Sequence, residues 1–258
     1  TDVPNWPPYC FIENDRTVGI PSVYLPKHLV GNNQASKQGP ALKDWTLEPI
    51  LPALGNRAEQ YLQSRSDSAT PFLMYMPLTS PHTPLSVNDD WKGKSGLGLY
   101  GDFVMETDWS VGQVVAALER NGVLENTMIV YSADNGCSTT AQRNANKSKT
   151  EIIFQTGDGQ AIDPDAHYPS DIYRGHKTHL FEGGHRVPFI VRWDKGVAPG
   201  SSCDSIVGLT DFFATCADII GKPLPPQVSD SISFLPLLRG ETPDAKVARK
   251  DIIHHSYK

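Results

Sequence analysis

The sequence lacks the features that mark nucleic-acid-binding, membrane-spanning and zinc-binding proteins. Its 23 Lys and Arg residues against 29 Asp and Glu give a formal net charge of −6. No basic stripe is present, so a nucleic acid is not an expected partner. No apolar run approaches the roughly 20 residues that a membrane-spanning helix needs. None of the four cysteines stands in a Cys-x-x-Cys pair, so zinc and thioredoxin-type sites have no support.

What remains is an ordinary globular composition, with 39% hydrophobic and 20% charged residues. This suits one large domain or somewhat more. Cys203 and Cys216 could form a disulfide, although buried free thiols are slightly favoured. The chain starts at Thr1 without a signal-type segment, and Asp251 to Lys258 read as a strand. We therefore expect a fragment of a longer protein.

The pattern of apolar residues predicts alternating helices and strands after an irregular segment over residues 1–44. Helices are expected over residues 45–65, 99–121 and 209–220, and strands over 71–77, 127–132 and 187–193. A helix between strands 71–77 and 127–132 is typical of a βαβ crossover, whose strands are parallel. The sequence therefore predicts an α/β fold with a mostly parallel central sheet flanked by helices.

The strongest local signal is the segment from Tyr131 to Gly136, where a buried strand runs into Asp134-Asn135-Gly136. Asp-Asn-Gly is a common turn sequence, so by itself it is no more than a strand-to-turn connection. In open α/β sheets, however, ligands bind at the carboxyl ends of strands. A carboxylate beside an amide carbonyl offers hard oxygen ligands that suit calcium or magnesium.

Two cationic side chains are candidates for the same sheet edge. His82 follows the strand over 71–77, and Lys177 ends the long polar segment before the strand over 187–193. Together with a metal, they would make a site for an anionic ester: the lysine adds positive charge, and the histidine donates a proton to a departing oxygen. The alternatives are a rigid Pro-His-Thr-Pro turn with an exposed histidine and an ordinary solvated lysine.

Two other charged groupings have structural interpretations. The segment from Glu182 to Pro188 contains paired glycines, which permit a tight turn, and Glu182 with Arg186 is expected to form a buried pair. Asp102, Glu106 and Asp108 on the long helix could suggest a metal, but a solvated or salt-bridged helix face is favoured.

Several further motifs make the chain resemble the type I sulfatases, in the arylsulfatase A-like group of the alkaline phosphatase superfamily. The resemblance covers about residues 71–240, and the motifs come in the family's order. They are Pro71-Phe72-Leu73-Met74-Tyr75, Ser80-Pro81-His82-Thr83-Pro84, Tyr100-Gly101-Asp102, Ser132-Ala133-Asp134-Asn135-Gly136, Gly175-His176-Lys177, Glu182 to Pro188, Thr210-Asp211-Phe212 and Ser233 to Gly240. A single one is weak evidence, but the ordered set is specific.

The resemblance implies a sulfatase-like fold and roles for four residues. Asp134 and Asn135 would bind calcium, while His82 and Lys177 would contact the sulfate group and assist departure of the leaving oxygen. The family's nucleophile is a formylglycine hydrate made from Cys or Ser in a Cys/Ser-x-Pro/Ala-x-Arg motif. It attacks sulfur, and the sulfated diol then collapses to aldehyde and inorganic sulfate.

The chain departs from the family because it contains no such nucleophile motif and lacks the early Asp-Asp metal ligands and the early Lys-x-His segment that lie upstream in relatives. This fits a missing upstream region. We expect residues 1–70 to be an extended segment and helix of the sulfatase domain, 71–240 its catalytic core, and 241–258 the start of a truncated C-terminal region. The isolated chain is expected to hydrolyse nothing.

Two other functions stay open. One is a phosphatase or phosphodiesterase of the same superfamily, whose members favour paired zinc. The other is a non-catalytic binder of sulfated glycans. The substrate is open between a sulfated small molecule and a sulfated glycan, and the loop over 138–173, with Arg143, Lys147, Lys149 and His167, is expected to border its pocket. By resemblance, the parent protein would be secreted, to the periplasm or the exterior.

Overall fold

A computed structural model describes residues 4–26, 37–66, 69–138, 167–241 and 249–255. The chain divides into two compact units. Unit 1 comprises residues 1–122 and 137–174, and unit 2 comprises residues 123–136 and 175–258. Each unit is described by itself. The predicted division at residues 70 and 240 stays a prediction.

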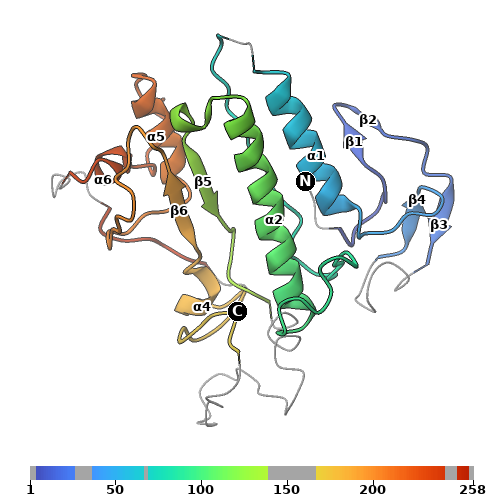
Figure 1. Cartoon of the computed structure of the whole chain (residues 1–258). Coiled ribbons are helices and arrows are strands. Elements are labelled where there is room, and N and C mark those ends of the chain that lie inside the picture. The colour runs from blue at the N-terminus through green and yellow to red at the C-terminus, as the bar shows by residue number, and fades with distance from the viewer. Residues whose placement is uncertain (1–3, 27–36, 67–68, 139–166, 242–248, 256–258) are drawn as a thin grey trace. The chain divides into compact units, whose positions relative to one another are not determined.

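Unit 1 is built around two helices, α1 (Ile50–Gln63) and α2 (Leu99–Arg120), which lie side by side (Figure 1). Gly55 of α1 sits close to the Ser110 hydroxyl of α2, and Arg120 Nη2 donates to Glu59 Oε1 at 2.5 Å. Helix α2 ends as the sequence predicts, because Gly122 takes the left-handed conformation with φ +65°. Both helices therefore confirm the helical patterns of the sequence.

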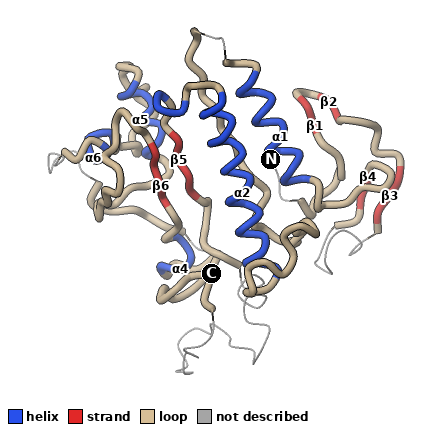
Figure 2. The backbone as a smooth tube through the Cα atoms, viewed as in Figure 1, coloured by secondary structure: helices blue, strands red, loops and turns tan. Residues whose placement is uncertain are grey.

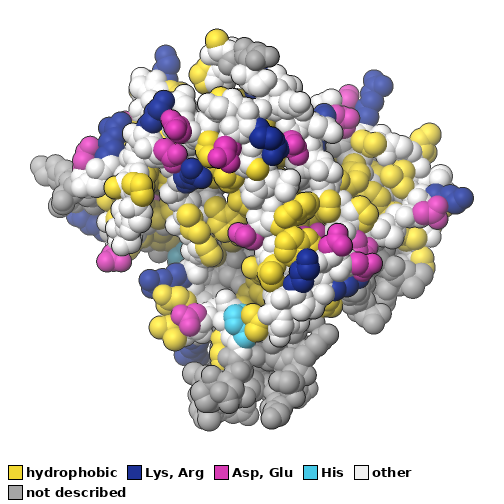
Figure 3. Space-filling model, in the orientation of Figure 1, with side chains coloured by type: hydrophobic (Ala, Val, Ile, Leu, Met, Phe, Trp, Pro, Cys, Tyr) yellow, Lys and Arg dark blue, Asp and Glu magenta, His cyan; other side chains and the backbone are white. Residues whose placement is uncertain are grey.

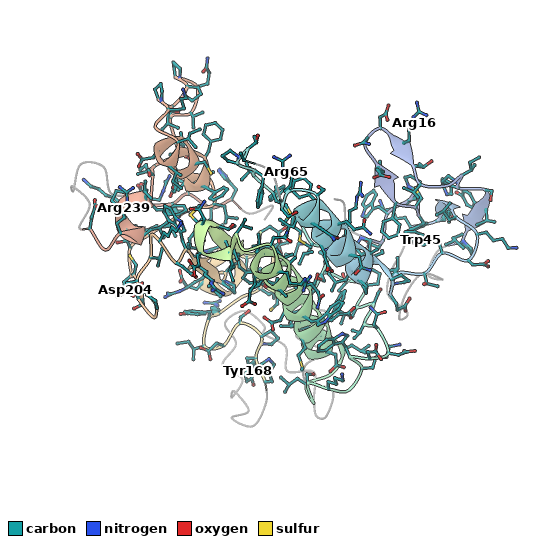
Figure 4. The ribbon with its side chains drawn as sticks, turned by 45° about the horizontal axis from the view of Figure 1, so that its top comes forward. Arg16, Trp45, Arg65, Tyr168, Asp204 and Arg239 are labelled. Atoms are coloured by element: carbon teal, nitrogen blue, oxygen red, sulfur yellow. The ribbon has the colours of Figure 1, made fainter. Side chains whose placement is uncertain are left out.

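Apolar spacing along α1 explains which face it buries. Ile50, Leu51, Ala58 and Leu62 recur at helical intervals and are buried. Two apolar clusters meet this face: one contains Tyr9, Ala41, Leu47 and Ile50, and the other contains Leu51, Leu85, Val87 and Phe103. Figure 4 labels Trp45 just before α1 and Arg65 just after it. Trp45 packs against the first cluster, where its ring meets that of Phe11 edge-on at 5.2 Å.

The segment that the sequence predicts to be irregular contains four short strands. Strand β1 (Ile12–Glu13) pairs antiparallel with β2 (Arg16–Thr17), and β3 (Val23–Leu25) pairs antiparallel with β4 (Gly39–Ala41) (Figure 2). Strands of two or three residues are too short to show a period of alternating apolar residues, so the sequence pattern does not predict them.

The strand predicted over residues 71–77 is not formed. Exposure alternates along this segment as in a strand, with Leu73 74% and Tyr75 85% exposed, yet no ladder pairs it with a neighbour. The predicted βαβ crossover is therefore absent from the residues that the structure describes. Alternation of exposed and half-buried side chains shows that a segment can adopt a strand conformation. A strand also needs hydrogen bonds to a neighbouring strand, which a pattern within the segment does not report.

The acidic residues of α2 correct a second expectation. Asp102 and Glu106 are buried, with 2% and 0% exposure, rather than forming a solvated face. Asp102 accepts hydrogen bonds from the amides of Gly93 and Ser95 and from the Ser95 hydroxyl, at 2.7–2.9 Å. Glu106 accepts from the amide and side chain of Asn88; burial raises the pKa of its carboxyl, and these bonds oppose the rise. Both carboxylates therefore anchor the loop before α2.

Unit 2 contains a two-stranded antiparallel sheet with short helices. Strand β5 (Ile129–Ser132), preceded by the 3₁₀ turn η1 (Leu124–Asn126), pairs with β6 (Phe189–Arg192), so that Ser132 lies opposite Phe189. The helices are α4 (Glu182–His185), α5 (Asp211–Ile219) and α6 (Leu235–Leu238). Phe189 meets Phe234 edge-on at 5.3 Å, which joins β6 to the residue before α6.

The distribution of surface side chains and the state of the cysteines do not favour one function over another. All four cysteines are free, as favoured, but they are not buried as expected: Cys203 is exposed and the other three are half-buried. Hydrophobic, acidic and basic side chains are mixed on the face drawn in Figure 3. Within the described residues, no helix has the length and hydrophobicity required to cross a bilayer.

Candidate functional site

The turn after β5 presents the predicted metal ligands. Asp134 is exposed and Asn135 is half-buried. The side-chain amide of Asn135 donates to Asp134 Oδ1 at 3.0 Å, so the two side chains face each other. As predicted, an acid and an amide lie together at the carboxyl end of a strand, although this strand is half-buried rather than buried. Their role as metal ligands stays a prediction.

Antiparallel pairing brings the start of β6 to this turn. Ser132, the last residue of β5, donates from its hydroxyl to Pro188 O at 2.9 Å. Two residues past Asp134, the amide of Gly136 donates to Gly184 O at 2.9 Å. A Cβ at Gly136 would lie 1.9 Å from Gly183 O, so the two backbones touch with no room for a side chain. Helix α4 therefore packs directly against the turn that carries Asp134 and Asn135.

The loop that carries Lys177 packs on the other side of α4. A Cβ at Gly184 would lie 2.1 Å from His179 O and 2.8 Å from His176 O. The amide of His179 donates to His176 O at 2.9 Å, which closes a turn around Lys177. Gly184 therefore touches both flanks of the Lys177 turn, while its carbonyl holds Gly136. Through this one glycine, the Lys177 loop and the Asp134-Asn135 turn are held in a fixed relation.

The backbone next to Lys177 is strained. Thr178 has φ +80°, in a region that a β-branched residue rarely adopts. Such conformations cost about 1–3 kcal/mol and persist where the surroundings over-determine them, often at ligand sites. His176 braces the other side, since its Nδ1–H donates to Lys177 O at 2.8 Å and its ring lies 3.9 Å from that of His179. The sequence pattern does not reveal this backbone angle.

His82 belongs to unit 1, apart from the three residues of unit 2. It is half-buried between Pro81 and Pro84, and its Nδ1–H donates to Thr83 O at 2.5 Å. This bond fixes the orientation of the His82 ring. The structure thus brings Asp134, Asn135 and Lys177 into one unit, and the convergence of His82 with them stays a prediction.

The donor set fits a hard cation only in part. Asp134 and Asn135 supply oxygen ligands of the kind that calcium takes, but calcium takes six to eight of them. Within the described ranges, no three His, Cys, Asp or Glu side chains are grouped as a metal site. Further ligands are therefore needed beside this pair.

The glycine-rich segment before β6 has the predicted structural role, with one correction. Glu182 and Arg186 do pair, at 3.2 Å, but their side chains are 52% and 60% exposed. The pair lies in water rather than in the core, because α4 turns its backbone, not its side chains, toward the site. The expected pocket-bordering residues Arg143, Lys147 and Lys149 lie outside the described residues, while His167 lies within them.

The chain is similar in sequence to known proteins of one family. The sulfatase family model matches residues 32–222, well over half of the chain. An N-acetylgalactosamine-6-O-sulfatase of Bacteroides thetaiotaomicron is 31% identical over 199 residues, which cover 76% of this chain and 36% of that protein. Human steryl-sulfatase is 35% identical over 186 residues, covering 72% and 29%.

Among solved structures, a protein of glycosaminoglycan metabolism from Bacteroides thetaiotaomicron superposes with a TM-score of 0.63 at 29% identity, over 80% of this chain and 39% of that one. The similarity confirms the predicted sulfatase-like α/β fold. Within the described residues, however, the three strand pairs are antiparallel rather than mostly parallel. The chain spans about a third of the length of the relatives that it matches. From its motifs, its family match and its fold, this chain belongs to the sulfatase family.

Proposed function

We propose that residues 1–258 are part of a longer sulfatase that hydrolyses sulfuric esters. The observation that carries the proposal is the contact between Gly184 and Gly136, which holds the Lys177 loop against the Asp134-Asn135 turn. A lysine fixed beside a carboxylate-and-amide turn suits a tetrahedral anion, whose charge the lysine and a metal neutralise together. Family membership supports the same reaction.

Each residue has a distinct task in this proposal. Lys177 binds a sulfate oxygen as a compact positive charge, on a backbone that His176 and Thr178 hold in place. His82 donates a proton from Nε2 to the departing oxygen, while Thr83 O fixes the ring through Nδ1. The nucleophile is a formylglycine supplied by a part of the protein outside these 258 residues.

Calcium would be held by Asp134 and Asn135 with further ligands from outside these residues. When bound, it would polarise the sulfate group and neutralise part of its charge. The hydrogen bond from Asn135 to Asp134 Oδ1 keeps the two side chains together before an ion arrives. Binding through Asn135 then requires its carbonyl oxygen, rather than its NH₂, to face the ion.

The substrate class is a sulfate ester on a sugar or another small molecule. The two relatives named above act on different molecules, an amino sugar and a steroid by their names, so family membership does not choose between them. We infer a sulfated glycan or a sulfated small molecule as partner. The resemblance also implies a periplasmic or extracellular location, which fractionation of the producing cells would test.

The test is sulfate release from a fluorogenic aryl sulfate by the complete protein that contains these residues, with the matching aryl phosphate as the control. Sulfate release well above phosphate release supports the proposal. Preferred release of phosphate would instead indicate a phosphatase of the same superfamily. Binding of a sulfated glycan without any release would indicate a non-catalytic binder.

The isolated 258-residue chain is the second arm of the test. It lacks the Cys/Ser-x-Pro/Ala-x-Arg motif, so it is expected to release no sulfate. Turnover by this chain alone would show that the nucleophile lies within it and that the assignment is wrong.

A further inference from the structure

The segment over residues 249–255 is fastened to unit 2 at its first residue. The Arg249 guanidinium donates to both carboxylate oxygens of Asp211, at 2.8 and 2.6 Å, and to Asp230 O at 2.7 Å. The Arg249 and Asp211 side chains are only 9% and 2% exposed. Three residues later, Ile252 packs over Gly208, where a Cβ would lie 3.4 Å from Ile252 Cδ1. This end of the segment is therefore firmly held.

The far end of the segment is held by a different contact. The His254 ring stacks on the His185 ring of α4, with centroids 3.8 Å apart and planes at 17°. His185 Nε2–H donates to Leu180 O at 3.0 Å, which fixes the orientation of that ring. Two neutral imidazoles stack favourably, whereas two imidazolium rings at this separation repel each other.

The charged groups around the stack come from the two elements that meet there. Helix α4 and the residue after it contribute Glu182 and Arg186, which are paired with each other. The segment itself contributes Lys250, Asp251 and His255. Burial and the neighbouring His185 lower the pKa of His254, and Glu182 opposes them. The pairing of Glu182 with Arg186 limits that opposition, so the stack favours the neutral form of His254.

We propose that the stack of His185 on His254 is an acid-released latch, closed at neutral pH, which frees residues 253–255 from α4 when the rings are protonated. The direction of the pH response follows from the preference of the stack for neutral rings. The latch is fully closed above the ordinary imidazole range near pH 6.5 and is lost as the pH falls through the lowered pKa of His254. Arg249 keeps its two charge-assisted bonds to Asp211 in this range, so the segment swings out from a fixed end.

The latch acts next to the candidate site without being part of it. His185 follows Gly184, whose carbonyl holds the Asp134-Asn135-Gly136 turn. Opening removes the His254 ring from α4 and exposes the face of α4 that this ring covers. The inference concerns the 258-residue chain itself and stands whether or not the parent protein is a sulfatase.

Hydrogen–deuterium exchange of peptides covering residues 249–255 tests the latch at about pH 5 and pH 7.5, after correction for intrinsic exchange rates. The native chain is expected to exchange about tenfold faster at the lower pH. His254→Phe keeps an aromatic ring without a titrating proton, so its exchange should stay slow at both values. His255→Phe removes a neighbouring histidine outside the stack and should keep the native response.

The idea is overturned if the native chain shows no pH response or if His254→Phe retains it. A direct titration covers the case in which a variant does not fold. Proton NMR of the native chain should give His254 a pKa below the ordinary imidazole value, and His185→Gln should raise it. An ordinary pKa in the native chain, or no change in His185→Gln, would also reject the latch.

Discussion

The amide of Gly136 donates a hydrogen bond to the carbonyl of Gly184 at 2.9 Å, and this one contact joins the two loops of unit 2 that carry the candidate site. The Asp134-Asn135 turn lies on one side of it and the Lys177 loop on the other. Because both positions lack a side chain, the backbones meet closely enough for main-chain atoms to set the geometry. Gly136 and Gly184 are therefore required by distance rather than by a positive φ.

Substituting Gly184 with alanine should destabilise unit 2. The added Cβ would lie 2.1 Å from His179 O, a backbone atom that cannot move without shifting the Lys177 turn. We expect a loss of about 1–3 kcal/mol, as for other overpacked positions, measured by urea unfolding. Exchange of amides in the Lys177 loop should rise at the same time.

Gly112→Ala is the matched control. Gly112 lies within α2, is exposed, and a Cβ there meets nothing within 4 Å. Alanine should therefore stabilise the helix by about 0.5–1 kcal/mol. If both variants changed the free energy of unfolding alike, close backbone contact would not explain Gly184.

The buried pair of Asp211 and Arg249 predicts a large loss of stability in Asp211→Asn. Removing one charge leaves Arg249 buried without its counter-ion, which typically costs about 3–5 kcal/mol. Asp230→Asn is the control, since Asp230 is 89% exposed and lies 3.7 Å from Arg249, so it should cost at most about 1 kcal/mol. Urea unfolding that shows equal losses would contradict the prediction.

The same pair predicts a dependence on pH. Burial raises the pKa of the Asp211 carboxyl, but hydrogen bonds from Arg249 and from the amides of Ile232 and Gly208 outweigh it, so the pKa lies below its ordinary value. The stability that Asp211 contributes is therefore present above about pH 4 and is lost as the pH falls through the lowered pKa. The difference between native and Asp211→Asn chains should shrink below that pH.

Asp102→Asn should loosen the loop before α2. The carboxylate accepts three hydrogen bonds in a buried position, and an amide cannot accept on its nitrogen. A loss of about 2–4 kcal/mol is expected by thermal unfolding. Asp108→Asn, an exposed position on the same helix, should stay within about 0.5 kcal/mol. Equal effects would mean that Asp102 does not anchor the loop.

The contrast between Asp102 and Asp108 also shows where sequence reasoning stops. Helical periodicity placed α2 to within one residue, because it is a local property. Whether an acid on that helix is solvated depends on amides of residues 93 and 95, and no pattern within the helix reports them. The same limit applies to residues 71–77, where alternation was visible but pairing was not.

The candidate site also has features that the sequence predicts and features that it does not. Its candidate ligand residues could be named because Asp-Asn-Gly follows a strand and because the motifs follow the order of a known family. The contact between Gly136 and Gly184 joins positions 48 residues apart through main-chain atoms (184 minus 136). The strain at Thr178 is a backbone angle, and no residue type marks it. Neither could be derived from composition or spacing.

Lys177→Ala in the complete enzyme should lower kcat by about a hundredfold to a thousandfold, the usual effect of losing one preorganised group at a transferring anion. Lys177→Arg keeps the charge on a wider group and should recover part of the rate. Lys195→Ala removes an exposed lysine of the same unit, whose Nζ donates to Asn126 Oδ1 at 3.3 Å, and should leave the rate unchanged. An unchanged kcat in Lys177→Ala would remove this residue from the reaction.

Asp134→Asn in the complete protein should weaken calcium binding at least about tenfold, because calcium affinity depends on the number of charged oxygen ligands. The substitution keeps the shape of the side chain while removing its charge. Asp194→Asn makes the same change of charge in unit 2 at a carboxylate that pairs with Arg192 at 3.0 Å, so its calcium affinity should be that of the native protein. Isothermal titration of chelator-treated protein with calcium measures both. Native affinity in Asp134→Asn would place the ion elsewhere, and equal weakening in both variants would mean that net charge rather than a ligand had been lost.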